Sequence, residues 1–262
     1  MKIDQKNLFS TKIAKNNLDD PETTNSRRML LKKNKFLSKI YEEWFQMLFQ
    51  HIPETDSCVL EIGAGPGFSN NFSKNVILTD ILHVNDIDVQ CDGTNLPFKN
   101  EAFHAVIMIN VLHHIQGPAR FFSEASRCLR NNGVICMIEP WNTSWSKFIY
   151  TYFHFELFDP SYHEWELEKG GPLSKSNQAM PWIILSRDFN KFISHYPEFS
   201  IEVFQKLMPL VYILSGGFSY RCLIPAFTYG LWRKLERSFE SKQGMFAFIV
   251  IRKRSLSNPV AK

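Results

Sequence analysis

The segment that most constrains the fold is 59–68, which reads VLEIGAGPGF. An apolar run ends in an acid, and three glycines follow within five positions. Glycine tolerates positive φ and lets a ligand approach bare backbone, so the pattern is typical of a buried strand that turns sharply beneath a cofactor. The segment alone leaves the class of cofactor open, and a helix N-terminus is expected to follow it.

Strands and helices alternate after residue 57. Such alternation predicts an α/β fold with a parallel sheet and right-handed crossovers. Besides the strand before the glycines, strands are expected at 76–80, 87–92, 102–110, 133–140, 198–206 and 245–254, and helices at 118–130 and 180–196.

The rest of the chain divides by composition. Residues 1–26 are polar and read as a loose arm, and apolar residues at helical spacing predict a helix within 27–53, ended by Pro53. Residues 27–262 are expected to form a single domain.

Five scattered cysteines and the lack of a signal sequence favour a cytoplasmic protein. The apolar segment 207–232 is interrupted by Arg221 and two glycines, so it reads as buried or interfacial.

Phosphate-binding glycine turns fit the sequence poorly. Phe68 stands where the dinucleotide fingerprint has its third glycine, and no Lys-Ser/Thr pair ends the turn as in a Walker loop. Asp80 ends the second strand, where a carboxylate can bind both ribose hydroxyls, and Asp92 ends the third, where it can accept from an adenine amino group. With Glu61 they place three acids around one pocket, which suits a cationic, phosphate-free ligand.

Several motifs occur in a fixed order: VLEIGAGPG, TD, DGTNLPF, FHAVIMINVLHHI and RFFSEASRCLRNNGVICMIEP. Over 57–140 they resemble the class I S-adenosylmethionine-dependent methyltransferases, and more narrowly the small-molecule subgroup that includes quinone-biosynthesis methyltransferases. The resemblance implies a Rossmann-like, mostly parallel sheet of seven strands with an antiparallel last strand and helices on both faces. It makes 57–140 the cofactor-binding core and the last two strands a closing hairpin.

The resemblance also implies S-adenosylmethionine as cofactor and assigns residues to it. Asp80 would hold the ribose hydroxyls. The other expected contacts are Glu61, Gly63, Ala64, Gly65 and Gly67 for the methionine and ribose, Asp92 and Gly93 for the adenine, and Asn110 and Val111 for the methionine and the reactive end. No metal is expected, because no standard ligand spacing is present.

Methyl transfer from a sulfonium needs alignment and exclusion of water, and it needs a base only if the acceptor loses a proton. Strand ends carry the candidates, His113 and His114 after the fourth strand and Glu139 at the end of the fifth. His154 and Glu156 are alternatives. Each of these side chains could instead serve packing or backbone hydrogen bonding.

Two segments rich in aromatics, 141–180 and 207–243, are expected to cap the open end of the sheet over an apolar pocket. They favour O- or C-methylation of a small or lipid-linked hydrophobic acceptor, with peripheral membrane contact left open. The alternatives are a tRNA-modifying methyltransferase, a non-catalytic cofactor-binding scaffold and a nicotinamide-dependent oxidoreductase. A net charge of +4 argues against a nucleic-acid partner.

Overall fold

The computed structural model describes residues 17–52, 57–65, 68–222 and 224–255. The strands are β1 (Val59–Ile62), β2 (Val76–Asp80), β3 (Val89–Gln90), β4 (Phe103–Ile109), β5 (Leu129–Pro140), β6 (Phe199–Leu207) and β7 (Phe246–Lys253). The α-helices are α1 (Pro21–Lys33), α2 (Lys35–Phe49), α3 (Pro118–Cys128), α4 (Ser144–Phe153), α5 (Met180–Trp182), α6 (Phe189–His195), α7 (Val211–Ser215) and α8 (Tyr229–Gln243). Short 3₁₀ turns lie at Ser69–Asn71, Leu112–His114 and Ala226–Thr228, and a π-turn at Ile183–Arg187 joins α5 to α6.

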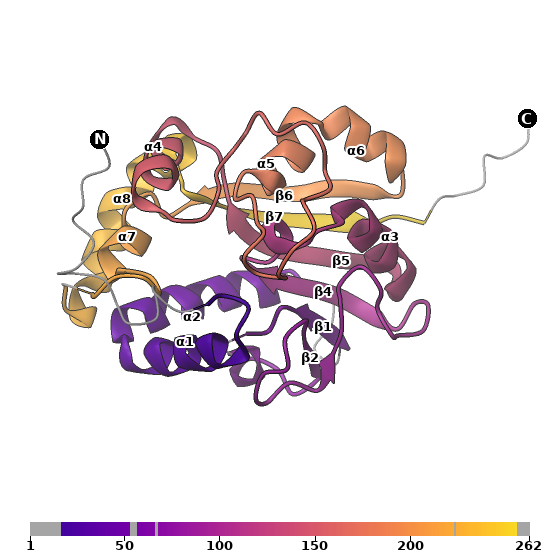
Figure 1. Cartoon of the computed structure of the whole chain (residues 1–262), viewed down its shortest axis with the longest axis horizontal. Coiled ribbons are helices and arrows are strands. Elements are labelled where there is room, and N and C mark those ends of the chain that lie inside the picture. The colour runs from indigo at the N-terminus through magenta and orange to yellow at the C-terminus, as the bar shows by residue number, and fades with distance from the viewer. Residues whose placement is uncertain (1–16, 53–56, 66–67, 223, 256–262) are drawn as a thin grey trace, which may run out of the picture.

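The strands form one sheet in the order β3-β2-β1-β4-β5-β7-β6 (Figure 1). The pairs among β1 to β5 are parallel, whereas β7 runs antiparallel to both β5 and β6. β1 lies between β2 and β4, so the strand order switches sides at β1, the strand that leads into the glycine turn. The predicted Rossmann-like sheet with an antiparallel last strand is confirmed.

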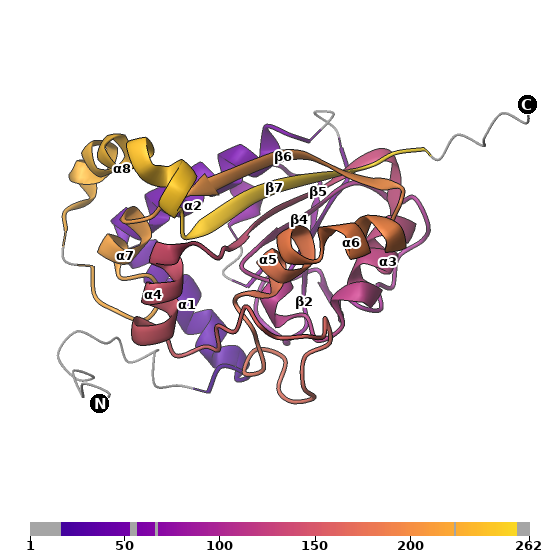
Figure 2. The same ribbon diagram turned by 90° about the horizontal axis from the view of Figure 1, so that it is seen from above.

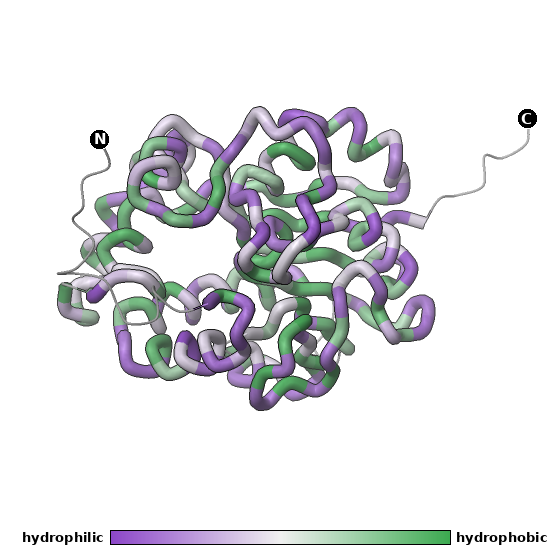
Figure 3. Tube along the Cα trace, viewed as in Figure 1, coloured by the Kyte–Doolittle hydropathy of each residue, from purple (hydrophilic) through white to green (hydrophobic). Residues whose placement is uncertain are grey.

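Alternate residues of the strands supply two hydrophobic cores. Leu60, Val106 and Ile135 face one side, where α3, α5 and α6 pack, and Val59, Ala105 and Val134 face the other, where α2 and α7 pack. This two-sided burial explains why the central strands read as continuous apolar runs. Figure 3 shows hydrophobic residues along the sheet and hydrophilic ones on the outer turns.

The expected loose arm is wrong for residues 21–26, which form the start of α1. Asp20 caps the helix by accepting from the backbone N–H of Glu22, and Pro21 occupies the first turn. Thr23 and Thr24 are buried, and Arg28 of the same helix binds Asp86 and the carbonyls of Asn85 and Gly65. Residues 1–16 and the predicted helix end at Pro53 lie outside the described part. Instead of one helix, α1 continues to Lys33 and α2 begins at Lys35, and the two meet at Asn34.

A helix does not follow the glycine turn within the described residues; a single 3₁₀ turn at Ser69–Asn71 bridges β1 and β2. Asn70 and Asn71 are poor helix formers, and the connection is short. Phe68 and Phe72 instead stack on Phe45 of α2, with ring centroids 5.8 and 5.6 Å away. Aromatic packing therefore replaces the expected helix.

Helices α1, α4, α7 and α8 gather at the end of the sheet where the parallel strands finish (Figures 1 and 2). Arg221 is exposed, whereas Arg233 on α8 is buried together with Glu236 and Glu240. In the described part of the chain, no helix combines the length and the apolar character required to cross a bilayer.

Candidate active site

A cavity of about 460 Å³ lies at the ends of β1 to β5. The sheet side contributes the glycine turn and the residues that follow β2, β3 and β4. The segments 141–180 and 207–243 both contribute to its wall, chiefly with aromatic side chains such as Tyr150, Phe153, Tyr212 and Tyr220. Thr24, Arg27 and Tyr41 from the two N-terminal helices complete the lining.

Two positions of the glycine turn require glycine because their backbone has positive φ. Gly63 has φ of 65°, and a Cβ there would lie 2.6 Å from Cγ2 of Val111. Gly65 has φ of 39°, and its N–H donates to Oδ2 of Asp80 at 3.0 Å. Both line the cavity, so a ligand meets bare backbone at this point, as the sequence predicts.

The expected ribose and adenine carboxylates lie at the cavity. Asp80 is buried and accepts from the N–H groups of Gly65 and Leu82 at 3.0 and 2.9 Å. A carboxylate offers about four acceptor positions, so Asp80 retains capacity for two hydroxyl donors. Asp92 is exposed at the rim, accepts from the N–H of Thr94 at 2.8 Å, and is followed by Gly93 in the lining.

Asn110 and Val111 form the end of β4 in the cavity wall. Asn110 adopts a left-handed φ of 57°, a conformation that costs free energy in a non-glycine residue. Its Oδ1 atom is buried and has no hydrogen-bond partner among the described residues. An unpaired buried acceptor is stabilised by a ligand that brings a donor to it.

Glu61 is placed differently from the prediction. It is buried but absent from the residues lining the cavity, and it accepts a hydrogen bond from the hydroxyl of Ser69. Burial raises the pKa of Glu61 to about 8, so this carboxyl is largely protonated at neutral pH. The alternation of the strand explains the difference, because the neighbouring Ile62 takes the cavity side. Ala64 is buried outside the lining, and Gly67 lies outside the described residues.

His113 and Glu139 form a buried pair. His113 Nδ1 lies 2.8 Å from Glu139 Oε2, and Glu139 Oε1 accepts from the N–H groups of Val111 and Leu112 at 2.7 and 2.8 Å. Glu139 is fully buried and lies outside the cavity lining. It therefore positions His113 and the turn after β4, and it does not face the cavity as a reacting group.

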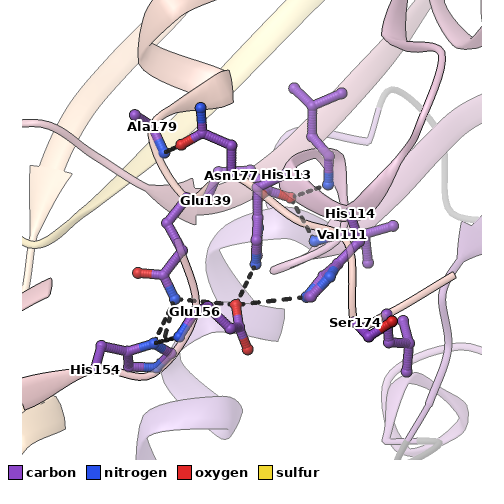
Figure 4. Close-up of polar contacts among 12 residues, drawn as sticks. Val111, His113, His114, Glu139, His154, Glu156, Ser174, Asn177 and Ala179 are labelled. Carbon is purple, nitrogen blue, oxygen red and sulfur yellow. Dashed lines mark hydrogen bonds and ion pairs between the residues drawn. The ribbon is translucent and has the colours of Figure 1, made fainter. Parts of the chain in front are cut away.

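Glu156 is the carboxylate that the cap brings to this pair. Its Oε2 lies 3.5 Å from His113 Nε2 and 3.9 Å from His114 Nε2, and it accepts from Gln178 Nε2 at 3.1 Å. Gln178 Nε2 also lies 3.1 Å from His154 Nδ1. Figure 4 shows Glu156 between His154 on one side and the two adjacent histidines on the other. The structure thus brings all five predicted candidates into one cluster.

The histidines of the cluster differ in charge. Burial alone would lower the pKa of His113, but hydrogen bonds to Glu139 and Glu156 raise it to about 9. Burial and the charge of His113 lower the pKa of His114 to about 3, and burial lowers that of His154. Burial opposes ionisation of Glu156, but its contacts with His113 and the other histidines hold its pKa well below the usual range.

At neutral pH the cluster is therefore an imidazolium at His113 next to an ionised Glu156, with neutral His114 and His154. His113 holds its proton and is not available as a base. Glu156 is ionised and faces the cavity, so it is the better-placed proton acceptor. Sequence reasoning missed Gln178, because only its contact with Glu156 gives it a role.

The raised pKa of His113 predicts a pH-dependent stability. The folded protein binds this proton more tightly than the unfolded chain, whose histidine pKa is near 6.5. The contribution is full below pH 6.5 and is lost as the pH rises through about 9. Its size is about 3 kcal/mol, because one pKa unit corresponds to about 1.4 kcal/mol. Urea unfolding between pH 6 and 10 should show a decline that is shallower in His113→Gln. Equal slopes in both proteins would contradict the assigned protonation.

His113, His114 and Glu156 could each offer one ligand atom to a metal ion. These three atoms lie within 4.8 Å of one another. The hydrogen bonds of His113 and Glu156 already account for their charges without an ion. The geometry therefore permits a cation but does not require one.

Comparisons with known proteins agree with this geometry. Residues 60–137 match a family model described as a methyltransferase domain. No curated protein matches the chain by sequence. Among solved structures, a Thermotoga maritima S-adenosylmethionine-dependent methyltransferase, described as a possible histamine N-methyltransferase, aligns with a TM-score of 0.54 and 15% identity over 90% of this chain and 98% of that one. Geranyl diphosphate C-methyltransferase from Streptomyces coelicolor, solved with Mg²⁺, geranyl diphosphate and S-adenosyl-L-homocysteine, aligns with a TM-score of 0.51 and 11% identity over 84% and 81%.

The structural likeness shows the fold, and the matched segment covers the glycine turn and the strand ends of the cavity. Residues 60–137 therefore match a methyltransferase domain, and this match together with the fold indicates S-adenosylmethionine as the cofactor. The residues present fit this cofactor: paired glycines, Asp80 with spare acceptor capacity, and the unpaired Oδ1 of Asn110. The resemblance to the quinone-biosynthesis subgroup stays a prediction.

The assignment of Asp80 can be tested by binding. Asp80→Ala removes the carboxylate expected to accept from the ribose hydroxyls, so S-adenosylhomocysteine should bind about 10- to 100-fold more weakly, as for hydrogen bonds to a charged group. Isothermal titration calorimetry measures the change, and Glu42→Ala, which alters an exposed acid outside the cavity lining, is the control. Equal affinity in the wild type and Asp80→Ala would refute the assignment.

Proposed function

We propose that this protein transfers the methyl group of S-adenosylmethionine to an oxygen or carbon of a small or lipid-linked hydrophobic acceptor. The observation that carries the proposal is the placement of the ionised Glu156 in a cavity that also contains the glycine turn and the strand-end acids. The bound cofactor supplies an activated methyl group on a sulfonium. The protein supplies alignment, exclusion of water and a proton acceptor.

In the proposed mechanism, Glu156 accepts the proton that the acceptor loses as its new bond to the methyl carbon forms. His113 and Gln178 hold the carboxylate in place, since both contact Oε2 of Glu156. Glu139 fixes His113 through Nδ1, so Nε2 is the nitrogen directed at Glu156. The neutral His114 completes the wall beside them, with its pKa lowered to about 3 by burial and by the charge of His113.

The nature of the cap supports a hydrophobic acceptor. Tyr150, Phe153, Phe155, Tyr212 and Tyr220 line the cavity, and on this side of it His154, Glu156 and Gln178 supply polar groups. Pockets of this kind bind mainly apolar molecules and orient them with a few polar groups. An acceptor with an aromatic or isoprenoid body and one ionisable hydroxyl or carbon acid fits this lining.

A lipid-linked acceptor and peripheral membrane contact form part of the proposal. Phe153, Phe155 and Tyr220 line the cavity and are also exposed by 55%, 50% and 42%. Phe227, in the 3₁₀ turn before α8, and Leu231, in the first turn of α8, are exposed by 87% and 59%. Exposed aromatic side chains at a cavity mouth would let an acceptor enter from an apolar phase.

The test is methyl transfer from radiolabelled S-adenosylmethionine to a panel of phenols, prenylated quinols, polyprenyl-linked sugars and unmodified tRNA. We expect label in at least one hydrophobic hydroxylated or carbon-acid acceptor and none in tRNA. Label in tRNA alone would contradict the proposed acceptor class. Cofactor binding without label in any acceptor would favour a scaffold protein.

A further inference from the structure

Arg27 is a positively charged residue in the cavity wall. None of the cofactor-binding roles given above involves it. Of the described residues that line the cavity, it is the only lysine or arginine. Its Nε atom is buried and has no hydrogen-bond partner among the described residues. The guanidinium carbon lies 5.7 Å from the centre of the Phe218 ring, so an aromatic face covers one side of it.

The neighbouring Arg28, on the same helix, has hydrogen-bond partners for its guanidinium group. Its guanidinium binds Asp86 Oδ2 at 2.5 Å, the carbonyl of Asn85 at 2.7 Å and the carbonyl of Gly65 at 3.2 Å. These contacts fix α1 against the glycine turn. Because successive residues of a helix point in different directions, Arg28 faces the loop after β2 and Arg27 faces the cavity.

Arg27 makes no ion pair with an acid of the described residues, and a guanidinium in such a position favours an anionic ligand. Its planar set of N–H donors matches a carboxylate in a two-point arrangement. Each of the three acids that line the cavity contacts other groups: Asp80 and Asp92 accept from backbone N–H groups, and Glu156 contacts the histidine cluster. The balancing charge is therefore expected to arrive with the ligand.

We infer that Arg27 binds a carboxylate group of a ligand in this cavity. The source favoured by position is the methionine carboxylate of the cofactor, an identification that rests on the proposed function. Thr24, one turn before Arg28, has its methyl group 3.8 Å from the Cβ position of Gly65, which places this part of α1 over the glycine turn. A carboxylate on the acceptor is the other source of the same chemistry.

The test compares two ligands that differ in the amino-acid portion. S-adenosylhomocysteine carries the carboxylate, and 5′-methylthioadenosine keeps the adenosine and the thioether without it. We expect calorimetry to show that Arg27→Gln binds S-adenosylhomocysteine about 10- to 100-fold more weakly than the wild type does. The affinity for 5′-methylthioadenosine should change by less than about 2-fold. Arg221→Gln, which removes an exposed arginine outside this cavity, should change neither.

A second measurement distinguishes the acceptor as the source. Benzoate is titrated into protein saturated with S-adenosylhomocysteine. Binding by the wild type that is lost in Arg27→Gln, together with unchanged S-adenosylhomocysteine affinity, would assign Arg27 to an anionic acceptor. The inference would be overturned if Arg27→Gln bound S-adenosylhomocysteine and benzoate with the same affinities as the wild type, with an unchanged circular dichroism spectrum. Failure of the wild type to bind S-adenosylhomocysteine would instead refute the proposed function.

Discussion

Glu156→Gln is expected to lower kcat by about 10²- to 10⁴-fold, the usual contribution of a positioned proton acceptor. The amide keeps the size of the side chain and can still contact Gln178, but it cannot take a proton. Because Glu156 belongs to the cap and not to the strand ends, affinity for S-adenosylhomocysteine should change little. The measurement is steady-state methyl transfer to the acceptor found in the panel, with cofactor affinity measured separately.

Glu164→Gln is the matched control, since Glu164 is an exposed acid of the same segment outside the cavity lining. It should retain full activity. Full activity of Glu156→Gln would remove this residue from the mechanism. A loss confined to cofactor affinity would make Glu156 a binding residue and leave the reaction without a base in this cluster.

Arg233→Leu should lower the free energy of unfolding by about 3–5 kcal/mol, the usual cost of removing one partner from a buried ion pair. Arg233 is buried on α8 and binds Glu43 of α2 at 2.5 Å, as well as Glu236 and Glu240 of its own helix. Its loss would leave buried carboxylates without a counter-charge. Glu236 and Glu240 also accept from backbone N–H groups after β6, so the whole end of the sheet would be affected.

Urea unfolding followed by circular dichroism measures this effect. The control is Lys234→Ala, which alters the next residue of α8, an exposed one, and should change stability by less than about 0.5 kcal/mol. Equal stabilities of Arg233→Leu and the wild type would show that the ion network adds nothing to the packing of α8 on α2.

The sheet was predictable because its signals are local. Each parallel strand is a buried apolar run, and Gly63, Gly65 and Asp80 occupy positions that the turn and the strand end define. The second short strand, 76–80, was predicted with its bounds, and the order of motifs implied the antiparallel last strand.

The errors concern contacts between distant segments. The composition of 21–26 suggests a loose arm, but α1 is held by Arg28 through partners 37 to 58 residues away. Glu61 lies in the cofactor motif, yet the pleat of β1 turns it away from the cavity. The charge state of His113 depends on its contacts with Glu139 and Glu156, which are 26 and 43 residues further along the chain. No sequence motif predicts that these side chains are in contact.

We expect this cavity to bind a methyl donor and not a dinucleotide. Isothermal titration calorimetry of the wild type with S-adenosylmethionine, S-adenosylhomocysteine and NAD tests it most directly. We expect both sulfur nucleotides to bind with sub-millimolar Kd and NAD to give no saturable heat. Saturable binding of NAD, with neither sulfur nucleotide binding below the millimolar range, would contradict the account.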